Sequence, residues 1–385
     1  MHNKKDIIEF IRKLYRSPGF IPLHAPIFHG NEKKYLENCI DSTFVSSVGK
    51  YVDCFEEMVC KFTGSMRAIS VVNGTNALQI ALKLSGVDKG TEVITQPLTF
   101  VATCNAIRYL GADPVFIDVD KDTMGLSPES MKLFLEKHAI VQNGNTCNKK
   151  TGKKIAACVP MHTFGHPARI EEIVDLCTEY YIPVVEDAAE SIGSYINDKH
   201  TGRFGRLGIL SFNGNKSITT GGGGMIITSD SGLGDLAKHI TTTAKIPHRW
   251  EFYHDMTGYN FRLPNINAAL GCAQMEKLPE ILRIKRDIAK KYADFFTEVN
   301  EVDFVSERHG TISNHWLNIL IVKDREERDS FLKYTNANGV MTRPAWTLMN
   351  RLPMYRDALR IDLINSEWLE DRIVCIPSGV PQDLL

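Results

Sequence analysis

The stretch Ile69-Ser-Val-Val-Asn-Gly-Thr-Asn-Ala-Leu78 decides how this chain folds. An apolar run ends at Asn73-Gly74, and a helical pattern begins at Thr75. A buried strand that passes through a tight turn into a helix is the unit of parallel, helix-covered sheets. The first N–H groups of such a helix are free and partially positive, so the turn can bind an anion such as phosphate. An ordinary capped helix start is the simpler alternative, and this stretch alone leaves both open.

Apolar runs alternate with helical patterns from this stretch to residue 185. Strands are expected at 92–95, 114–119, 155–160 and 183–185, and helices at 100–110, 127–137 and 168–180. This order predicts an α/β fold with a mostly parallel central sheet flanked by helices. In such sheets ligands gather beyond the carboxyl ends of the strands.

Three parts of the chain differ in pattern. We expect an N-terminal helix and arm at 1–30, a large domain at 31–265, and a linking helix with a smaller α+β domain at 266–385. Pro279 is expected to kink or split the helical pattern at 265–299. The polar residues 140–154 are expected to form a surface insertion.

Composition excludes several classes of function. The net charge of −1 provides no basic field for nucleic acid. Nine scattered cysteines without a Cys-x-x-Cys pair fit a reduced, cytoplasmic protein. No apolar run approaches the roughly 18 residues that a membrane-spanning helix needs, so no membrane span is expected.

A single lysine, Lys216, lies between the apolar run 208–210 and the four glycines 221–224. A lysine on a tight strand–loop–strand element can face a planar ligand closely. If it is desolvated it loses its proton more readily and becomes a nucleophile toward an aldehyde. The alternative is a surface lysine beside a flexible turn.

Three more residues follow predicted strands. Asp187 ends the run Val184-Val-Glu-Asp187, where a buried acid needs a cationic partner such as a charged heterocyclic nitrogen. Phe100, at the head of a predicted helix, could stack on a ring, and Ser211 could add a hydroxyl to an anion site. Taken singly, Asp187 is equally an N-cap or one half of an ion pair, and Phe100 is more often a core residue.

Together these residues describe one ligand, pyridoxal 5'-phosphate. Its phosphate would lie on Gly74, Thr75, Asn76 and Ser211, its ring under Phe100, its ring nitrogen on Asp187 and its aldehyde on Lys216. No metal is expected, because Gly165 and Pro167 argue against a helix that would align His162 with His166. The glycines at 202, 205 and 208 lack the spacing of a dinucleotide-binding loop.

Five motifs carry a resemblance to a known family. They are Val72-Asn-Gly-Thr-Asn-Ala-Leu78, Thr99-Phe-Val-Ala-Thr103, Val185-Glu-Asp-Ala-Ala-Glu190, Ser211-Phe-Asn-Gly-Asn-Lys216 and Gly258-Tyr-Asn-Phe-Arg262. From about Pro26 onward the chain resembles the DegT/DnrJ/EryC1/StrS sugar aminotransferases, which have the type I fold of pyridoxal-phosphate enzymes. The lysine motif and Thr342-Arg-Pro-Ala-Trp-Thr-Leu-Met349 are most similar to the LegC-type subgroup.

The resemblance implies a homodimer with shared active sites. Asn260 would reach the phosphate of the partner's cofactor, Ser47 and Arg262 would bind substrate, and Glu190 would lie near the cofactor's ring hydroxyl.

The resemblance also implies the reaction: glutamate would donate an amino group to C4 of a nucleotide-linked 4-keto-6-deoxy sugar. The best candidate acceptor is UDP-2-acetamido-2,6-dideoxy-4-hexulose, with a GDP-linked, perosamine-type sugar as the alternative. A related sugar dehydratase is disfavoured because those enzymes replace the lysine with histidine. A non-catalytic, cofactor-binding regulatory protein stays open as a further alternative.

Overall fold

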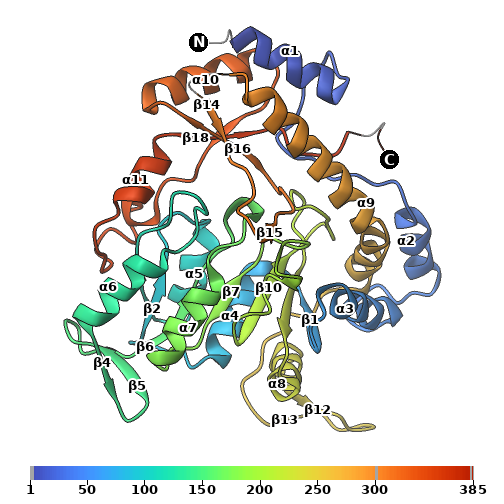
Figure 1. Cartoon of the computed structure of the whole chain (residues 1–385). Coiled ribbons are helices and arrows are strands. Elements are labelled where there is room, and N and C mark those ends of the chain that lie inside the picture. The colour runs from blue at the N-terminus through green and yellow to red at the C-terminus, as the bar shows by residue number, and fades with distance from the viewer. Residues whose placement is uncertain (1–3, 300–301, 382–383, 385) are drawn as a thin grey trace.

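The computed structural model describes residues 4–299, 302–381 and 384. Its centre is a run of strands in the order β3-β2-β6-β7-β10-β11-β1 (Figure 1). The strands form two hydrogen-bonded groups, β3-β2-β6 and β7-β10-β11-β1. Two parallel bridges, Cys158 with Val184 and Met161 with Asp187, join these groups between β6 and β7. Only β11 runs against the others, which confirms a mostly parallel sheet. The strands are β1 (Arg67–Val71), β2 (Glu92–Thr95), β3 (Asp113–Phe116), β6 (Ile155–Val159), β7 (Val185–Asp187), β10 (Leu207–Ser211) and β11 (Gly224–Thr228).

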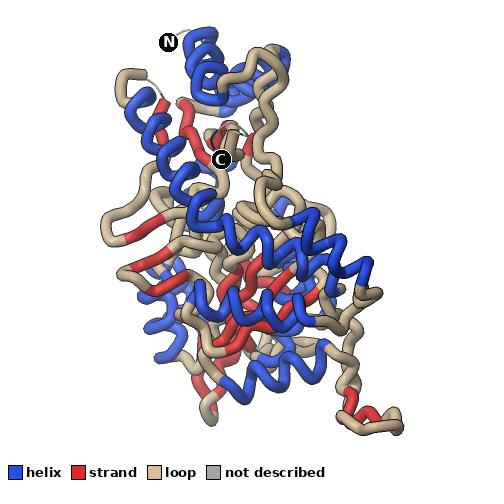
Figure 2. Tube along the Cα trace, turned by 90° about the vertical axis from the view of Figure 1, so that its right-hand side faces the viewer, coloured by secondary structure: helices blue, strands red, loops and turns tan. Residues whose placement is uncertain are grey.

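Helices bury both faces of this sheet, which is why its strands are continuous apolar runs. Along β10, Ile209 packs into one hydrophobic cluster and Leu210 into another. One cluster contains α4 (Gly74–Leu84), α5 (Val101–Tyr109) and α8 (Ser231–Thr241), and the other contains α3 (Lys50–Thr63) and α9 (Asn265–Phe296), beside which α2 (Glu32–Asp41) packs. Helices α6 (Pro128–His138) and α7 (Ile170–Glu179) cover the β2–β3–β6 end. Figure 2 shows helices on each side of the strands.

The long helix α9 runs without a break through Pro279. Pro279 therefore does not split this helix, and the other expected outcome, a kink, stays a prediction. Proline removes one backbone hydrogen bond, but Leu278, Ile281 and Leu282 are buried on either side of it in the cluster with α3. Packing of this face holds the helix together where local propensity alone would end it.

A second, smaller sheet in the order β14-β16-β18-β17 lies above the first in Figure 1. The N-terminal helix packs on this part, because Ile7 and Ile11 share a cluster with Phe331 and Val340. The first and last parts of the chain thus lie together, and the three-part division stays a prediction. The elements are α1 (Lys4–Tyr15), β14 (Val302–Phe304), β16 (Asn318–Val322), α10 (Arg325–Ala337), β17 (Arg343–Pro344), α11 (Ile364–Glu370) and β18 (Ile373–Ile376).

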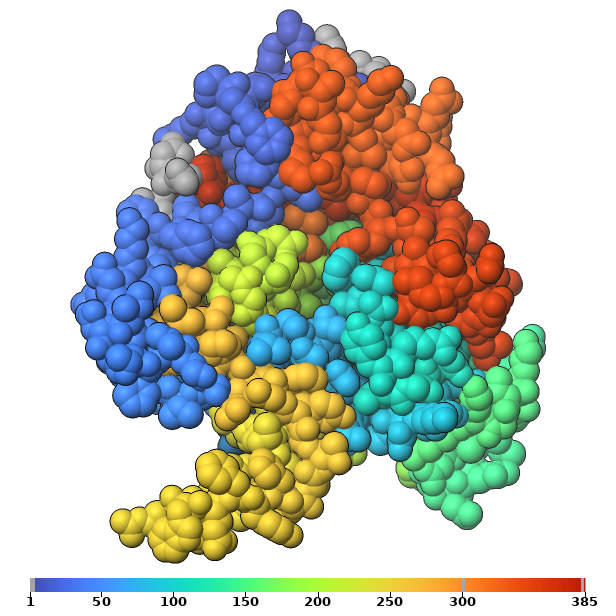
Figure 3. Space-filling view, turned by 180° about the vertical axis from the view of Figure 1, so that it is seen from behind, coloured from blue at the N-terminus to red at the C-terminus, as the bar shows by residue number. Residues whose placement is uncertain are grey.

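Several short hairpins and turns lie outside the two sheets. The polar insertion forms a hairpin of β4 (Ala139–Gln142) and β5 (Asn145–Asn148), yet Asn148 is buried and donates to Glu92 Oε2 at 2.8 Å. A hairpin of β12 (Lys245–Ile246) and β13 (Tyr253–His254) projects from the body (Figure 3). The rest are β8 (Tyr195–Ile196), β9 (Lys199–His200), β15 (Thr311–Ile312), η1 (Thr163–Gly165) and η2 (Met349–Arg351). Among the described helices, none has the length and apolar character to cross a membrane.

Candidate active site

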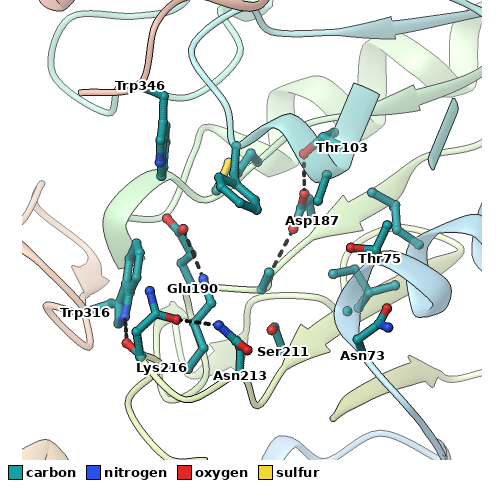
Figure 4. Close-up of a pocket in the computed structure, with 18 residues that line it drawn as sticks. Asn73, Thr75, Thr103, Asp187, Glu190, Ser211, Asn213, Lys216, Trp316 and Trp346 are labelled. Carbon is teal, nitrogen blue, oxygen red and sulfur yellow. Dashed lines mark hydrogen bonds and ion pairs between the residues drawn. The ribbon is translucent and has the colours of Figure 1, made fainter. Parts of the chain in front are cut away.

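A cavity of about 390 Å³ opens where β7 and β10 end and α4 and α5 begin (Figure 4). This is the carboxyl edge of the parallel strands, where ligands were expected. We call it the Lys216 cavity. Its lining residues are Asn73, Gly74, Thr75, Leu78, Phe100, Ala102, Thr103, Met161, Asp187, Ala189, Glu190, Ile209, Ser211, Asn213, Asn215, Lys216, Trp316 and Trp346.

The start of α4 forms one wall of the Lys216 cavity. Asn73 caps the helix by accepting a hydrogen bond from the backbone N–H of Asn76 at 2.8 Å. Helices leave their first N–H groups without intrahelical partners. A Cβ on Gly74 would lie 3.0 Å from Ser211 Cβ, so the glycine lets the helix start approach the end of β10. The capped helix start and the anion cradle are therefore compatible here, with Thr75 and Ser211 beside the same bare backbone.

The glycine run packs against this wall. A Cβ on Gly224, the last of the four glycines, would lie 2.4 Å from the backbone carbonyl carbon of Asn73. Strand β11 can therefore pass directly behind the start of α4 only because Gly224 has no side chain. This glycine supports the cradle from behind and does not line the cavity.

Asp187 is the last residue of β7 and is buried. Thr103 Oγ1 donates to its Oδ2 at 2.8 Å, and the N–H of Ala189 donates to its Oδ1 at 3.2 Å. Burial raises the pKa of this carboxyl, although Thr103, Ala189 and the Lys216 charge act the other way. Among the described residues Asp187 forms no ion pair, so a cation in the cavity would be its natural partner.

Lys216 and Glu190 form an ion pair in the cavity, in which Glu190 is buried and Lys216 is partly buried. Lys216 Nζ lies 3.1 Å from Glu190 Oε1, and the N–H of Phe164 donates to Glu190 Oε2 at 2.9 Å. Burial raises the pKa of Glu190 to about 7, and Lys216 opposes that shift. The Nζ atom also lies 4.0 Å from the centre of the Trp316 ring, within reach of a cation–π interaction.

Aromatic side chains enclose the other side of the Lys216 cavity. Phe100 is 50% exposed, and its ring lies 6.3 Å from that of Trp346. Trp346 in turn stacks on Phe164 at 4.8 Å. Phe100 was expected here from the sequence, whereas Trp316 and Trp346 were not assigned to the site. Both come from the C-terminal part, and the only signal for Trp346 was its place in the motif 342–349.

Four predicted site residues lie outside the Lys216 cavity. Asn76 turns its Nδ2 to Gln79 Oε1 at 3.5 Å, while its backbone N–H serves the helix cap. Asn260 is exposed, and its Oδ1 accepts from both Nε and Nη2 of Arg262 at 3.1 Å. Ser47 and Arg262 line a separate depression of about 160 Å³, which also contains Lys238. We call this the Arg262 depression.

The two histidines of the loop after β6, His162 and His166, make different contacts. His162 Nε2 lies 3.0 Å from Glu186 Oε2, and its Nδ1 accepts from the N–H of Ala168 at 3.1 Å. His166 instead faces His315 edge to face, with ring centres 5.4 Å apart. Neither histidine lines the Lys216 cavity.

Comparison with known proteins decides the family. The model of the DegT/DnrJ/EryC1/StrS aminotransferase family matches residues 26–382. The chain belongs to this family. A GDP-perosamine synthase of Escherichia coli O157:H7 is 35% identical over 88% of this chain and 88% of its own length. EpsN of Bacillus subtilis (strain 168), provisionally named a pyridoxal phosphate-dependent aminotransferase, is 35% identical over 96% of this chain and 91% of its own length.

Solved structures agree with the fold. The aminotransferase TlmJ from Streptoalloteichus hindustanus superposes with a TM-score of 0.84, covering 95% of each chain at 25% identity. The type I fold predicted from the sequence is thus confirmed. The chain is an enzyme, an aminotransferase that uses pyridoxal 5'-phosphate. The finer assignment to a LegC-like subgroup stays a prediction.

The residues present fit that cofactor. The buried carboxyl of Asp187, which has no cationic partner among the described side chains, suits a protonated ring nitrogen. The bare backbone at Gly74, with Thr75 and Ser211 beside it, suits a phosphate. Lys216 supplies the amine for covalent attachment. The donor set therefore contains a counterpart for the ring nitrogen, the phosphate and the aldehyde of the cofactor.

Proposed function

We propose that this aminotransferase moves an amino group from glutamate to C4 of a GDP-linked 4-keto-6-deoxy sugar. The Lys216–Glu190 ion pair, in the same cavity as Asp187, is the observation that carries amino transfer. The likeness to a GDP-perosamine synthase over most of both chains supports a GDP-linked acceptor. The same likeness favours the GDP-linked alternative over the UDP-linked sugar that the sequence motifs first suggested.

Pyridoxal phosphate, when bound, supplies an aldehyde that carries the amino group and a ring that takes up an electron pair. Asp187 would hold a proton on the ring nitrogen, because its buried carboxylate is stabilised by a positive partner. Thr75, Ser211 and the N–H groups at the start of α4 would hold the phosphate. Phe100 would pack against the ring and shield it from water.

Lys216 performs the proton transfers in this proposal. Its Nζ takes a proton from the α-carbon of glutamate in the first half of the reaction and delivers a proton to C4 of the sugar in the second. Glu190 Oε1, 3.1 Å away, holds Nζ in place. Because burial raises the pKa of Glu190 to about 7, this carboxyl can accept or return a proton near neutral pH.

We further propose that the chain works as a homodimer in which Asn260, Ser47 and Arg262 serve the partner's site. The Arg262 depression is distinct from the Lys216 cavity of the same chain. Val48, which lines this depression, is exposed, and so are the large apolar side chains of Phe44, Trp250 and Phe252 elsewhere on the surface. A second copy would cover them and bring the Asn260–Arg262 pair to a Lys216 cavity.

A panel of acceptors tests the proposed function. The purified enzyme is incubated with glutamate and either GDP- or UDP-linked 4-keto-6-deoxy sugars, and 2-oxoglutarate and the amino sugar are measured. We expect amination at C4 of the GDP-linked sugar. Turnover of UDP-linked sugars alone would overturn the GDP assignment, and release of no 2-oxoglutarate from glutamate would overturn the donor.

A further inference from the structure

A second cavity of about 410 Å³ lies beside the Lys216 cavity. The two share Asn215, Trp316 and Trp346 as lining residues. Most of the second cavity is apolar, with Leu23, Leu317 and Met341 among its walls, and none of its lining residues is acidic. It is therefore a compartment next to the reacting centre with room for part of a substrate.

Arg343, on β17, lines this second cavity and is exposed. Its Nη1 makes only long contacts with Asn336 Oδ1 at 3.4 Å and the carbonyl of Thr342 at 3.2 Å. Among the described residues it forms no ion pair. A planar guanidinium can bind a carboxylate through two parallel hydrogen bonds. Arg343 on β17 can therefore bind an anion in this cavity.

His24 also lines the second cavity and is half-buried. Its Nε2 lies 3.1 Å from Lys285 Nζ. Its Nδ1 is buried and has no hydrogen-bond partner among the described residues, so it is not presented to the cavity. Arg343 is therefore the charged group to which an anion in this cavity would bind.

Lys285 lies behind His24. It is buried in α9 and donates to the carbonyls of Ser378 at 2.5 Å and Trp316 at 3.3 Å, with no carboxylate partner among the described residues. Burial lowers the pKa of Lys285 to about 7. Burial also lowers the pKa of His24 well below its usual range, and the charges of Lys285 and Lys216 lower it further, so this imidazole is neutral and Arg343 supplies the positive charge in the second cavity.

We propose that the second cavity is a carboxylate subsite for the amino donor. The distal carboxylate of a dicarboxylic amino acid binds to the guanidinium of Arg343, and its methylene groups pack on the apolar walls. Its amino end lies toward the Lys216 cavity, across the shared Trp316 and Trp346. This subsite makes the enzyme select glutamate-like donors over monocarboxylic ones, and in naming that donor it rests on the proposed function.

The other anion of the reaction, the diphosphate of the nucleotide sugar, fits the second cavity less well. A diphosphate carries more charge than one guanidinium and one neutral histidine balance, and the walls here are mainly apolar. The Arg262 depression offers two cationic side chains, Lys238 and Arg262, on an open surface. The two substrates therefore use different cationic sites.

Binding of glutarate to the cofactor-loaded enzyme tests the subsite without turnover, because glutarate has both carboxylates and no amino group. Calorimetric titration should give saturable binding to the wild type, about tenfold weaker binding to Arg343→Met, and partial recovery in Arg343→Lys. Arg356→Met, an exposed arginine that lines neither cavity, is the matched control and should bind as the wild type does. Thermal unfolding verifies that each variant is folded.

Steady-state kinetics complete the test. In Arg343→Met the KM for glutamate should rise about tenfold while kcat and the KM for the nucleotide sugar stay within about threefold. Unchanged glutarate affinity in Arg343→Met, or a loss caused by Arg262→Met instead, would overturn the subsite. If Arg343→Met loses glutarate but no GDP-linked sugar is aminated, the subsite stands and the proposed function fails. If the sugar is aminated and Arg343→Met binds glutarate normally, only the subsite fails.

Discussion

The Lys216 cavity and the Arg262 depression differ in how completely one chain builds them. In the Lys216 cavity the charged groups are buried or partly buried and are held by internal partners, as Glu190 is by Lys216 and by the N–H of Phe164. In the Arg262 depression the guanidinium is hydrogen-bonded, among the described side chains, to the exposed Asn260 alone. One chain is therefore enough to position the side chains of the Lys216 cavity. The proposed nucleotide-sugar site, in contrast, is open on its outer side.

The largest effect is expected from a substitution in the Lys216 cavity itself. Lys216→Ala removes both the attachment point and the proton-transfer group, so kcat should fall by about 10⁴-fold or more. The visible absorbance of the bound cofactor should be lost as well. Both are measured on purified protein, by 2-oxoglutarate release and by absorption spectroscopy.

Lys199→Ala is the control for this change. Lys199 is exposed, contacts the Phe204 ring at 4.4 Å, and lines neither the Lys216 cavity nor the Arg262 depression. It should keep wild-type activity and absorbance. A Lys216→Ala enzyme that retained turnover would show that the cavity is not where amino transfer occurs.

The next effect comes from the opposite wall of the Lys216 cavity. In the native protein Thr103 Oγ1 donates a hydrogen bond to Asp187 at 2.8 Å. Asp187→Asn keeps the size of the side chain and can still accept this hydrogen bond. It cannot balance a positive ring nitrogen, so kcat should fall by about 10²- to 10³-fold with the fold intact. Asp175→Asn, at an exposed position of α7, is the matched control. Near-normal turnover in Asp187→Asn would make this acid structural.

Much of the Lys216 cavity could be predicted from the sequence, and the reason is geometric. Alternating strands and helices place the loops that follow parallel strands at one edge of the sheet, so Gly74, Asp187 and Lys216 are expected to meet there. Trp316 and Trp346 could not be placed in this way. They reach the cavity from the smaller sheet, and no local pattern specifies how that sheet docks on the first.

Tertiary packing also determined two features that local patterns did not specify. Pro279 lies within a continuous helix because buried side chains flank it on α9. The polar segment at 140–154 forms a hairpin whose Asn148 is buried on Glu92. In both places the deciding contacts come from residues far away in the sequence, which a reading of local propensity does not include.

The third prediction concerns Glu190, the buried carboxyl of the Lys216 cavity. Burial raises the pKa of Glu190 from its ordinary value of 4.5 to about 7. The folded state therefore holds this proton more tightly than the unfolded chain does, and Glu190 lowers stability progressively as pH rises from about 4.5 to 7. Glu190→Gln removes this dependence, which amounts to about 3 kcal/mol, or roughly 100-fold in the folding equilibrium.

Urea unfolding of the cofactor-free protein at pH 5 and pH 7 measures this difference. Between those pH values the wild type should lose stability relative to Glu190→Gln. The control is Glu179→Gln, an exposed glutamate at the end of α7, which should follow the wild type. Parallel pH profiles for the wild type and Glu190→Gln would mean that Glu190 is ionised in the folded protein throughout this range.

The smallest effect probes the open site. Arg262→Ala removes a guanidinium that Asn260 orients, and the KM for the nucleotide sugar should rise about tenfold, the loss of one charge-assisted contact. The KM for glutamate should not change, because the second cavity binds that substrate. Initial-rate kinetics with each substrate varied in turn measure both constants.

Mixing Arg262→Ala with Lys216→Ala then tests whether the open site is completed by a second copy. Each variant alone has a defect in every active site. If Arg262 serves the partner's Lys216 cavity, a mixed dimer contains one site with both defects and one with neither, so mixing should restore the wild-type KM in the active fraction. If both residues served the same chain, every site would keep one defect and mixing would restore nothing. Recovery would therefore locate the missing wall of the Arg262 depression on the partner.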